Sequence, residues 1–170
     1  MFKLWKLVCL FLTTSLLFGC NATNRSSRFI EPGGKVGDFL VTSGQEDETI
    51  YLWDLDCEVT NPENPSSQKL DCKASVGASV NPLVGIFDST ASGKLDEVWD
   101  EHVQEVTIDG LPVNLKAFGT INVDHPASGI NRLWNVQVSG AVPGEVRVHD
   151  WGVAGGIQYN VVITIRFIEP

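Results

Sequence analysis

Basic residues are scarce in this chain. Lysine and arginine together number 12, against 21 aspartates and glutamates, and the formal net charge is −9. A surface of this kind repels the phosphates of nucleic acids and of anionic lipid headgroups. The sequence also has no stretch in which clustered basic residues alternate with aromatic ones. We therefore exclude nucleic acid as a partner, and we expect any membrane contact to come from something other than surface charge.

Long apolar runs are missing as well. The most apolar stretch, Leu7–Phe18, has only 12 residues, whereas a helix that spans a bilayer needs about 20. Lys3 and Lys6 precede this stretch. A positive start followed by a short apolar run is typical of an export signal that is removed from the mature protein.

The end of this segment resembles the lipobox of bacterial lipoprotein precursors, with the residues Leu17-Phe18-Gly19-Cys20. The resemblance implies cleavage before Cys20 and transfer of a diacylglyceryl group to its thiol. Each buried CH₂ contributes about 0.8 kcal/mol, so two or more acyl chains anchor a protein stably. The implied location is the bacterial cell envelope, facing the periplasm or the cell exterior, with the membrane as a partner. Ordinary cleavage near Ala22, which would release the protein, stays open.

These features predict three parts. Residues 1–19 are the signal peptide, residues 20–28 are the lipidated cysteine and a polar tether, and residues 29–170 form a single β-rich domain. The domain is long enough to bury a hydrophobic core without many crosslinks.

Only two cysteines remain for the mature domain, because Cys9 lies in the leader and Cys20 is the proposed anchor. Cys57 and Cys72 form an even pair in an oxidising compartment, where a disulfide is expected. The turn-rich segment 61–67 lies between them. We therefore predict a Cys57–Cys72 disulfide that closes a hairpin or long loop.

Hydrophobic residues alternate with polar ones over much of the chain, above all in residues 113–123, 145–149 and 157–168. A period of two is typical of strands with one buried face. Asp109-Gly110 between two such segments predicts a tight hairpin. Residues 95–103 show helical spacing instead. The pattern predicts an all-β fold, either an antiparallel β-sandwich or a jelly-roll-like barrel, with one short helix near 95–103.

One pentapeptide, Arg-Phe-Ile-Glu-Pro, occurs twice, at 28–32 and 166–170. A simple interpretation is that the two ends lie side by side in the sheet, with Phe29 and Phe167 both turned towards the core.

Catalytic motifs are lacking. The sequence has no Gly-x-Ser-x-Gly elbow and no His-Glu-x-x-His motif, and its three histidines are 23 and 24 residues apart, so no metal or cofactor is predicted. An alternative stays open, since catalytic groups can converge in space. In that alternative a small secreted hydrolase or metal-dependent enzyme uses His125 and His149 with Asp124 and Asp150.

Trp151 is the tryptophan that we expect to be exposed, because it follows His149 and Asp150 at a predicted strand end and precedes Gly152, Gly155 and Gly156. Exposed aromatics on loops of a rigid sandwich are typical of binding sites. The favoured function is non-enzymatic binding or scaffolding at the membrane surface. A glycan-binding module that works through Trp151 is a further alternative.

Overall fold

The computed structural model describes residues 29–44, 48–64, 66–87, 95–125 and 129–170, with the backbone alone at 86, 87 and 125. The predicted signal peptide, Cys20 and the tether lie outside these residues. In the part of the chain that the structure describes, no helix has the length and apolarity needed to cross a membrane.

Strands dominate the described residues. The strands are β1 (Gly34–Val36), β2 (Phe39–Thr42), β3 (Ile50–Tyr51), β4 (Asp56–Thr60), β5 (Ser67–Ser75), β6 (Ser79–Asn81), β7 (Gly85–Phe87), β8 (Val103–Ile108), β9 (Leu111–Pro112), β10 (Thr120–His125), β11 (Gly129–Trp134), β12 (Gln137–Gly140), β13 (Gly144–Ala154) and β14 (Ile157–Ile168). The helical elements are η2 (Leu52–Asp54), α1 (Leu95–Glu101) and α2 (Leu115–Phe118). The predicted all-β fold is confirmed.

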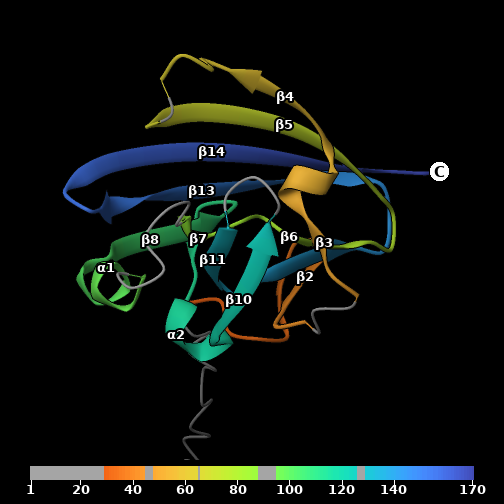
Figure 1. Ribbon diagram of the computed structural model, residues 1–170. Helices are drawn as coiled ribbons and strands as arrows, with labels where there is room; N and C mark the ends of the chain where they lie inside the picture. The colour runs from red at the N-terminus through yellow and green to blue at the C-terminus, as the bar shows by residue number, and fades with distance from the viewer. Residues whose placement is uncertain (1–28, 45–47, 65, 88–94, 126–128) are drawn as a thin grey trace, which may run out of the picture.

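The strands form three sheets in two layers. One layer is a six-stranded sheet in the order β4-β5-β14-β13-β8-β9, drawn at the top of Figure 1. The other layer holds a five-stranded sheet, β1-β2-β12-β6-β3, and a three-stranded sheet, β10-β11-β7. The long hairpin of β13 and β14 runs across the upper layer (Figure 1).

The core lies between the layers. The six-stranded sheet contributes the buried side chains Val146, Val148, Ile163, Ile165 and Phe167, and the five-stranded sheet contributes Val36, Phe39, Val41, Val80 and Val138. The rings of Phe39 and Phe167 meet across the interface, with centroids 5.5 Å apart. This interdigitation of two inner faces is how a β-sandwich closes its core.

Among the described strands two pairs are parallel, β5 with β14 and β3 with β6. A parallel pair requires a long crossover. Between β5 and β14 the chain builds most of the other layer, and this crossover takes the place of a helix. Alternation alone predicts strands but not their relative direction, so the antiparallel arrangement expected from the sequence holds for most pairs and not for these two.

Two local predictions are confirmed. The helical spacing near 95–103 corresponds to α1, which ends at Glu101. Asp109 and Gly110 both have positive φ, 48° and 79°, and connect β8 to β9. That conformation is the one a two-residue hairpin turn requires.

The prediction of one continuous strand over 113–123 is wrong. The helical turn α2 interrupts it, and Leu115 and Phe118 are both buried, although strict alternation would place them on opposite faces. Gly119 ends α2 with φ 71°, a conformation that glycine adopts without strain. The turn redirects the chain from the edge of the six-stranded sheet into β10.

The interpretation of the repeated pentapeptide is also wrong. Phe167 is buried, whereas Phe29 is 51% exposed and the buried residue of the first copy is Ile30. Ile30 bridges to Val113, and Phe167 instead pairs with Gly144 and Ala74. The two copies therefore have different neighbours. In the first copy the isoleucine is buried and the phenylalanine is exposed, and in the second copy the reverse holds.

The predicted disulfide between Cys57 and Cys72 is confirmed. The two residues face each other directly in the antiparallel register of β4 and β5, with their Cα atoms 4.1 Å apart. β4 is an edge strand, and the disulfide fastens it to the sheet.

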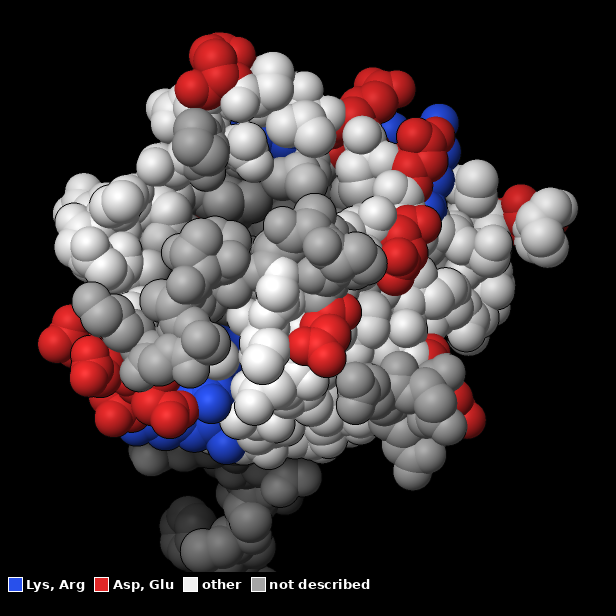
Figure 2. Space-filling model, viewed as in Figure 1, with Lys and Arg blue, Asp and Glu red and all other residues white. Residues whose placement is uncertain are grey.

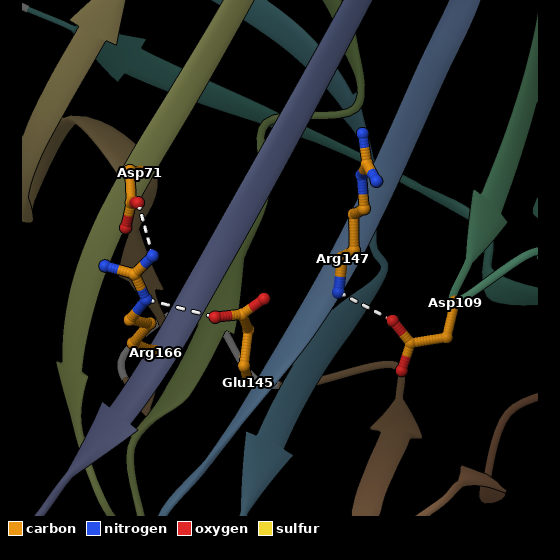
Figure 3. A network of polar contacts seen from close by, with 5 residues as sticks. All are labelled: Asp71, Asp109, Glu145, Arg147 and Arg166. Atoms are coloured by element: carbon orange, nitrogen blue, oxygen red, sulfur yellow. Dashed lines mark hydrogen bonds and ion pairs between the residues drawn. The ribbon is translucent and has the colours of Figure 1, made fainter.

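Several charged residues lie on the outer face of the six-stranded sheet. Arg166 on β14 lies between two carboxylates, with Nη2 2.7 Å from Asp71 and Nε 3.0 Å from Glu145 (Figure 3). The carboxylate of Asp109 accepts a hydrogen bond from the backbone N–H of Arg147 at 2.8 Å. Acidic side chains are scattered over the face of the molecule in Figure 2, and the basic ones there lie beside acidic ones.

Candidate functional site

Three residues predicted from the sequence lie in the middle of β13. His149, Asp150 and Trp151 belong to this strand and pair with both β14 and β8, so their predicted place at a strand end beside a loop is wrong. Successive side chains of a strand point to opposite faces. His149 and Trp151 therefore share the outer face, and Asp150 points into the sandwich.

The outer face is hollowed around Trp151. A depression of about 560 Å³ is lined there by residues that include His149, Trp151, Gln158 and Asn160. Trp151 is 41% exposed, and Nε2 of His149 lies 2.7 Å from Oδ1 of Asn160. The hollow therefore combines one exposed aromatic ring with several polar side chains.

The histidine and carboxylate set of the enzyme alternative does not assemble among the described side chains. Asp150 and His149 face opposite sides of β13, and Asp124 is exposed on β10, in another sheet. His125 also lies on β10, but its side chain is outside the described residues. Within the described ranges, no group of three His, Cys, Asp or Glu side chains is placed to hold a metal ion.

A larger cleft of about 600 Å³ opens between the two layers. Its lining is mainly apolar and consists of Leu52, Ser66, Gln68, Leu70, Pro82, Leu83, Gly85, Asp150, Ala154, Ile157, Tyr159, Val161 and Ile163. Residues from β5, β13 and β14 form one wall, and residues 82–85 with Leu52 form the other. We call this space the interlayer cleft.

The wall opposite the six-stranded sheet contains a strained turn. Leu83 has φ 60°, a conformation that is rare for a residue of its size. The side chain of Asn81, itself fully buried, accepts a hydrogen bond from the N–H of Leu83 at 2.8 Å and donates one to the carbonyl of Trp134 at 3.2 Å. Asn81 thus holds in place a backbone conformation that an unsupported chain would leave.

Among the described residues that line the cleft, Asp150 is the one with a carboxyl group, and it is 6% exposed. Its Oδ1 accepts a hydrogen bond of 2.8 Å from Nε2 of Gln104 on β8. Oε1 of Gln104 in turn accepts one of 2.9 Å from the indole N–H of Trp134. Trp134 therefore fixes the orientation of the amide that holds the acid.

Tyr159 extends the network on the other side of Asp150. Its hydroxyl hydrogen-bonds the carboxylate and lies 2.7 Å from Nε2 of His102. His102 directly follows α1, where its ring meets that of Trp99 at 5.8 Å. The short helix thus positions an imidazole at the end of a chain that runs from His102 through Tyr159 to Asp150.

Gly152 gives this network its space. It pairs with both Tyr159 and Gln104 across the sheet. A Cβ at this position would lie 2.8 Å from the Tyr159 hydroxyl and would clash with the carbonyl oxygen of Val103. Glycine is therefore required for the phenol to reach Asp150.

Burial governs the ionisation of these groups. It raises the pKa of Asp150 to about 7, and the hydrogen bonds from Gln104 and Tyr159 offset only part of that shift. It also lowers the pKa of His102 and, together with the nearby Asp150 charge, raises the pKa of Tyr159. At neutral pH the imidazole and the phenol are uncharged, and Asp150 exchanges between its two forms.

The single phenolic proton couples the two ends of the network. When Asp150 is ionised, Tyr159 donates to it and His102 donates its Nε2 proton to the phenolic oxygen. When Asp150 is protonated, it donates to Tyr159, which then donates to an unprotonated Nε2. Gain of a proton at Asp150 is thereby matched by a change of tautomer at His102.

Sequence reasoning missed the interlayer cleft and the roles of Gln104, Tyr159 and His102 in it. A signal for Asp150 was present, because it has the same alternation phase as the buried Val146 and Val148. A carboxylate at an inward-facing position predicts either a buried network or a site. Its partners come from β8 and β14, whose register the sequence does not show.

The chain was compared with known proteins by sequence and by structure. No family model matches it, no curated protein matches it, and no solved structure matches it. Any statement about function therefore depends on the geometry of the sites themselves.

Proposed function

We propose that this protein is a lipid-anchored component of the bacterial cell envelope whose sandwich domain binds a small ligand in the interlayer cleft, without catalysing a reaction. The observation that carries the binding role is the buried carboxyl of Asp150 on the wall of a cleft of about 600 Å³. Pockets of roughly 300–1,000 Å³ with apolar walls and few polar groups are typical of small-molecule sites.

A purely structural role accounts poorly for this arrangement. Protein interiors are close-packed, and voids larger than a water molecule are few. A buried carboxylate costs stability unless its environment compensates fully, and the raised pKa of Asp150 indicates that it does not. Groups with such perturbed pKa values cluster at functional sites.

The cleft can be tested by filling it. Ala154 lines the cleft at the end of β13, and Ala141 is an exposed residue of the β12–β13 connection. Ligands found by a small-molecule screen, with a rise in melting temperature as the readout, should lose their effect in Ala154→Trp and keep it in the matched control Ala141→Trp. Equal loss or equal retention in both variants would contradict a binding role for the cleft.

The anchor rests on the resemblance of Leu17-Phe18-Gly19-Cys20 to a lipobox, and it has its own test. Intact mass of the protein from the membrane fraction should give a chain that begins at Cys20 and carries two or three acyl chains. Cys20→Ser should leave the signal uncleaved at this point and the protein without lipid. An unmodified Cys20 in a protein that begins at Met1 would contradict both the anchor and the proposed location.

Glycan binding on the outer face is a second candidate function, favoured by the exposed Trp151 beside His149, Gln158 and Asn160 in the outer hollow. An aromatic ring with adjacent polar side chains suits the apolar face and hydroxyl groups of a sugar. Retention on a glycan array should disappear in Trp151→Ala and persist in Phe29→Ala, which removes an exposed aromatic residue outside this hollow. Unchanged retention in Trp151→Ala would eliminate the candidate.

A further inference from the structure

The described lining of the interlayer cleft carries one acid and no base. Asp150 and Tyr159 are its ionisable side chains, and Lys, Arg and His are absent from the described lining residues. Because burial keeps the phenol of Tyr159 neutral, the formal charge of this lining is either zero or negative. An anionic ligand such as a fatty acid or a phosphate ester would meet no opposite charge here.

The carboxylate of Asp150 has acceptor capacity to spare. Two oxygens offer about four lone-pair sites, and the network uses one for Gln104 and one for the hydroxyl of Tyr159. Since Asp150 also lines the cleft, the remaining capacity is available to a ligand. A hydrogen-bond donor with a positive charge would be the best partner for this carboxylate, because charge-assisted hydrogen bonds are about twice as strong as neutral ones.

The rest of the lining suits a hydrocarbon body. Leu70, Val161 and Ile163 from the six-stranded sheet face Leu52 and Leu83 across the cleft. An apolar group in this space leaves water and contributes about 25 cal/mol for each Å² that it buries. The acidic chain, with its net charge of −9, also attracts cations to the surface around the cleft.

We propose that the ligand of the interlayer cleft is a small hydrophobic amine, bound as its ammonium form with the charged nitrogen on Asp150 and the hydrocarbon body between the two layers. This inference rests on the proposed function and names the ligand class for the same site. The ammonium ion supplies both the donors and the opposite charge that the buried carboxylate needs.

The same geometry makes binding dependent on pH. The groups that face Asp150 are Gln104 and Val106 from β8 and Tyr159 and Val161 from β14, and His102 is the next titratable group, behind Tyr159. All of these are uncharged at neutral pH. Binding of the ammonium ion therefore requires loss of the Asp150 proton, and affinity falls by up to about tenfold for each pH unit below the pKa of this carboxyl.

Three probes with nearly the same hydrocarbon body test the ligand class: phenethylamine, 2-phenylethanol and 3-phenylpropionate. Calorimetry at pH 8 with the full chain should show binding of the amine at least about tenfold tighter than binding of the alcohol, and no binding of the acid. Asp150→Asn should make the amine and the alcohol equal. With the unaltered protein, a shift to pH 5 should weaken binding of the amine and leave that of the alcohol unchanged, which requires no variant to fold.

The outcomes distinguish the binding role of the cleft from the identity of its ligand as an amine. If the alcohol binds as tightly as the amine and both lose binding in Ala154→Trp, the cleft is a binding site but its ligand is not an amine. Tighter binding of the acid would overturn the proposal in the same way. If none of the three probes binds, the amine proposal fails, and the proposed function survives only if neutral compounds from the screen still bind in a manner that Ala154→Trp abolishes.

Discussion

The hydroxyl oxygen of Tyr159 lies 2.7 Å from Nε2 of His102, while the same hydroxyl hydrogen-bonds Asp150. The phenol therefore connects an imidazole at the end of α1 to a carboxyl group inside the sandwich. Its members come from the residue that follows α1 and from the two paired strands β13 and β14.

The coupling through Tyr159 predicts that the tautomer of His102 follows the ionisation of Asp150. Nitrogen NMR of the His102 ring should show Nε2 protonated at pH 8 and the Nδ1 tautomer gaining population as the pH falls towards 6. Tyr159→Phe removes the hydroxyl that relays the proton, so the tautomer in this variant should no longer respond in that range. A ring signal in the unaltered protein that stays constant between pH 8 and 6 would show that the groups are not coupled.

Asp150 should make the protein less stable as the pH rises. Its pKa is raised from 3.8 to about 7, so the folded state binds more protons than the unfolded state between these values. The free energy of unfolding therefore falls through this window by up to about 4 kcal/mol. Asp150→Asn should be more stable than the parent at pH 8 and nearly equal to it at pH 4. Urea denaturation at both values measures the difference.

A Cβ at position 152 should disrupt the network. In Gly152→Ala the new methyl group meets the backbone of Val103 and the hydroxyl of Tyr159, and overpacking of this kind costs about 1–3 kcal/mol. Gly144→Ala is a matched control on the same strand, since its Cβ would meet only the ring of Phe39, at 3.1 Å. Thermal unfolding should show the larger loss for Gly152→Ala. The reverse order would mean that β8 and Tyr159 move aside easily.

Reduction of the disulfide should weaken the edge of the six-stranded sheet. Cys57 and Cys72 are separated by 15 residues, and closing a loop of that length contributes about 3 kcal/mol in the chain-entropy model. The double variant Cys57→Ala, Cys72→Ala should show a loss of this size in urea denaturation. Added reductant should destabilise the parent by a similar amount and leave the double variant unchanged.

Much of the fold can be predicted from the sequence, because a strand with one buried face has apolar residues at every second position. The pattern over 157–168 corresponds to β14, and the spacing of Leu95, Val98 and Trp99 to α1. Alternation failed at Phe118, because the helical turn α2 replaces extended backbone there, so that Phe118 is buried and Ala117 is exposed. The sequence analysis also placed Trp151 at a strand end beside a loop, because glycines follow it. Gly152, however, belongs to β13, and only Gly155 and Gly156 lie beyond the strand.

The candidate site was much harder to predict than the fold. The inward phase of Asp150 can be read from its own strand, but its partner Gln104 depends on the register of β8 against β13. Tyr159 lies at an inward-facing position of β14 where an aromatic residue is an ordinary core residue. A site assembled across three strands and a short helix leaves no local motif, since its spacing is set by pairing in space.

The C-terminal strand should be indispensable, because β14 lies between β5 and β13 inside the six-stranded sheet. Removal of residues 164–170 deletes Ile165 and Phe167, which are 0% and 1% exposed. Loss of two such side chains costs about 5–10 kcal/mol, which is comparable to the whole stability of a typical domain. Removal of only Glu169 and Pro170, which are exposed and follow the strand, is the control and should be tolerated. Circular dichroism and limited proteolysis should show an unfolded chain for the longer deletion, and a folded product would mean that the β5–β13 gap can close without β14.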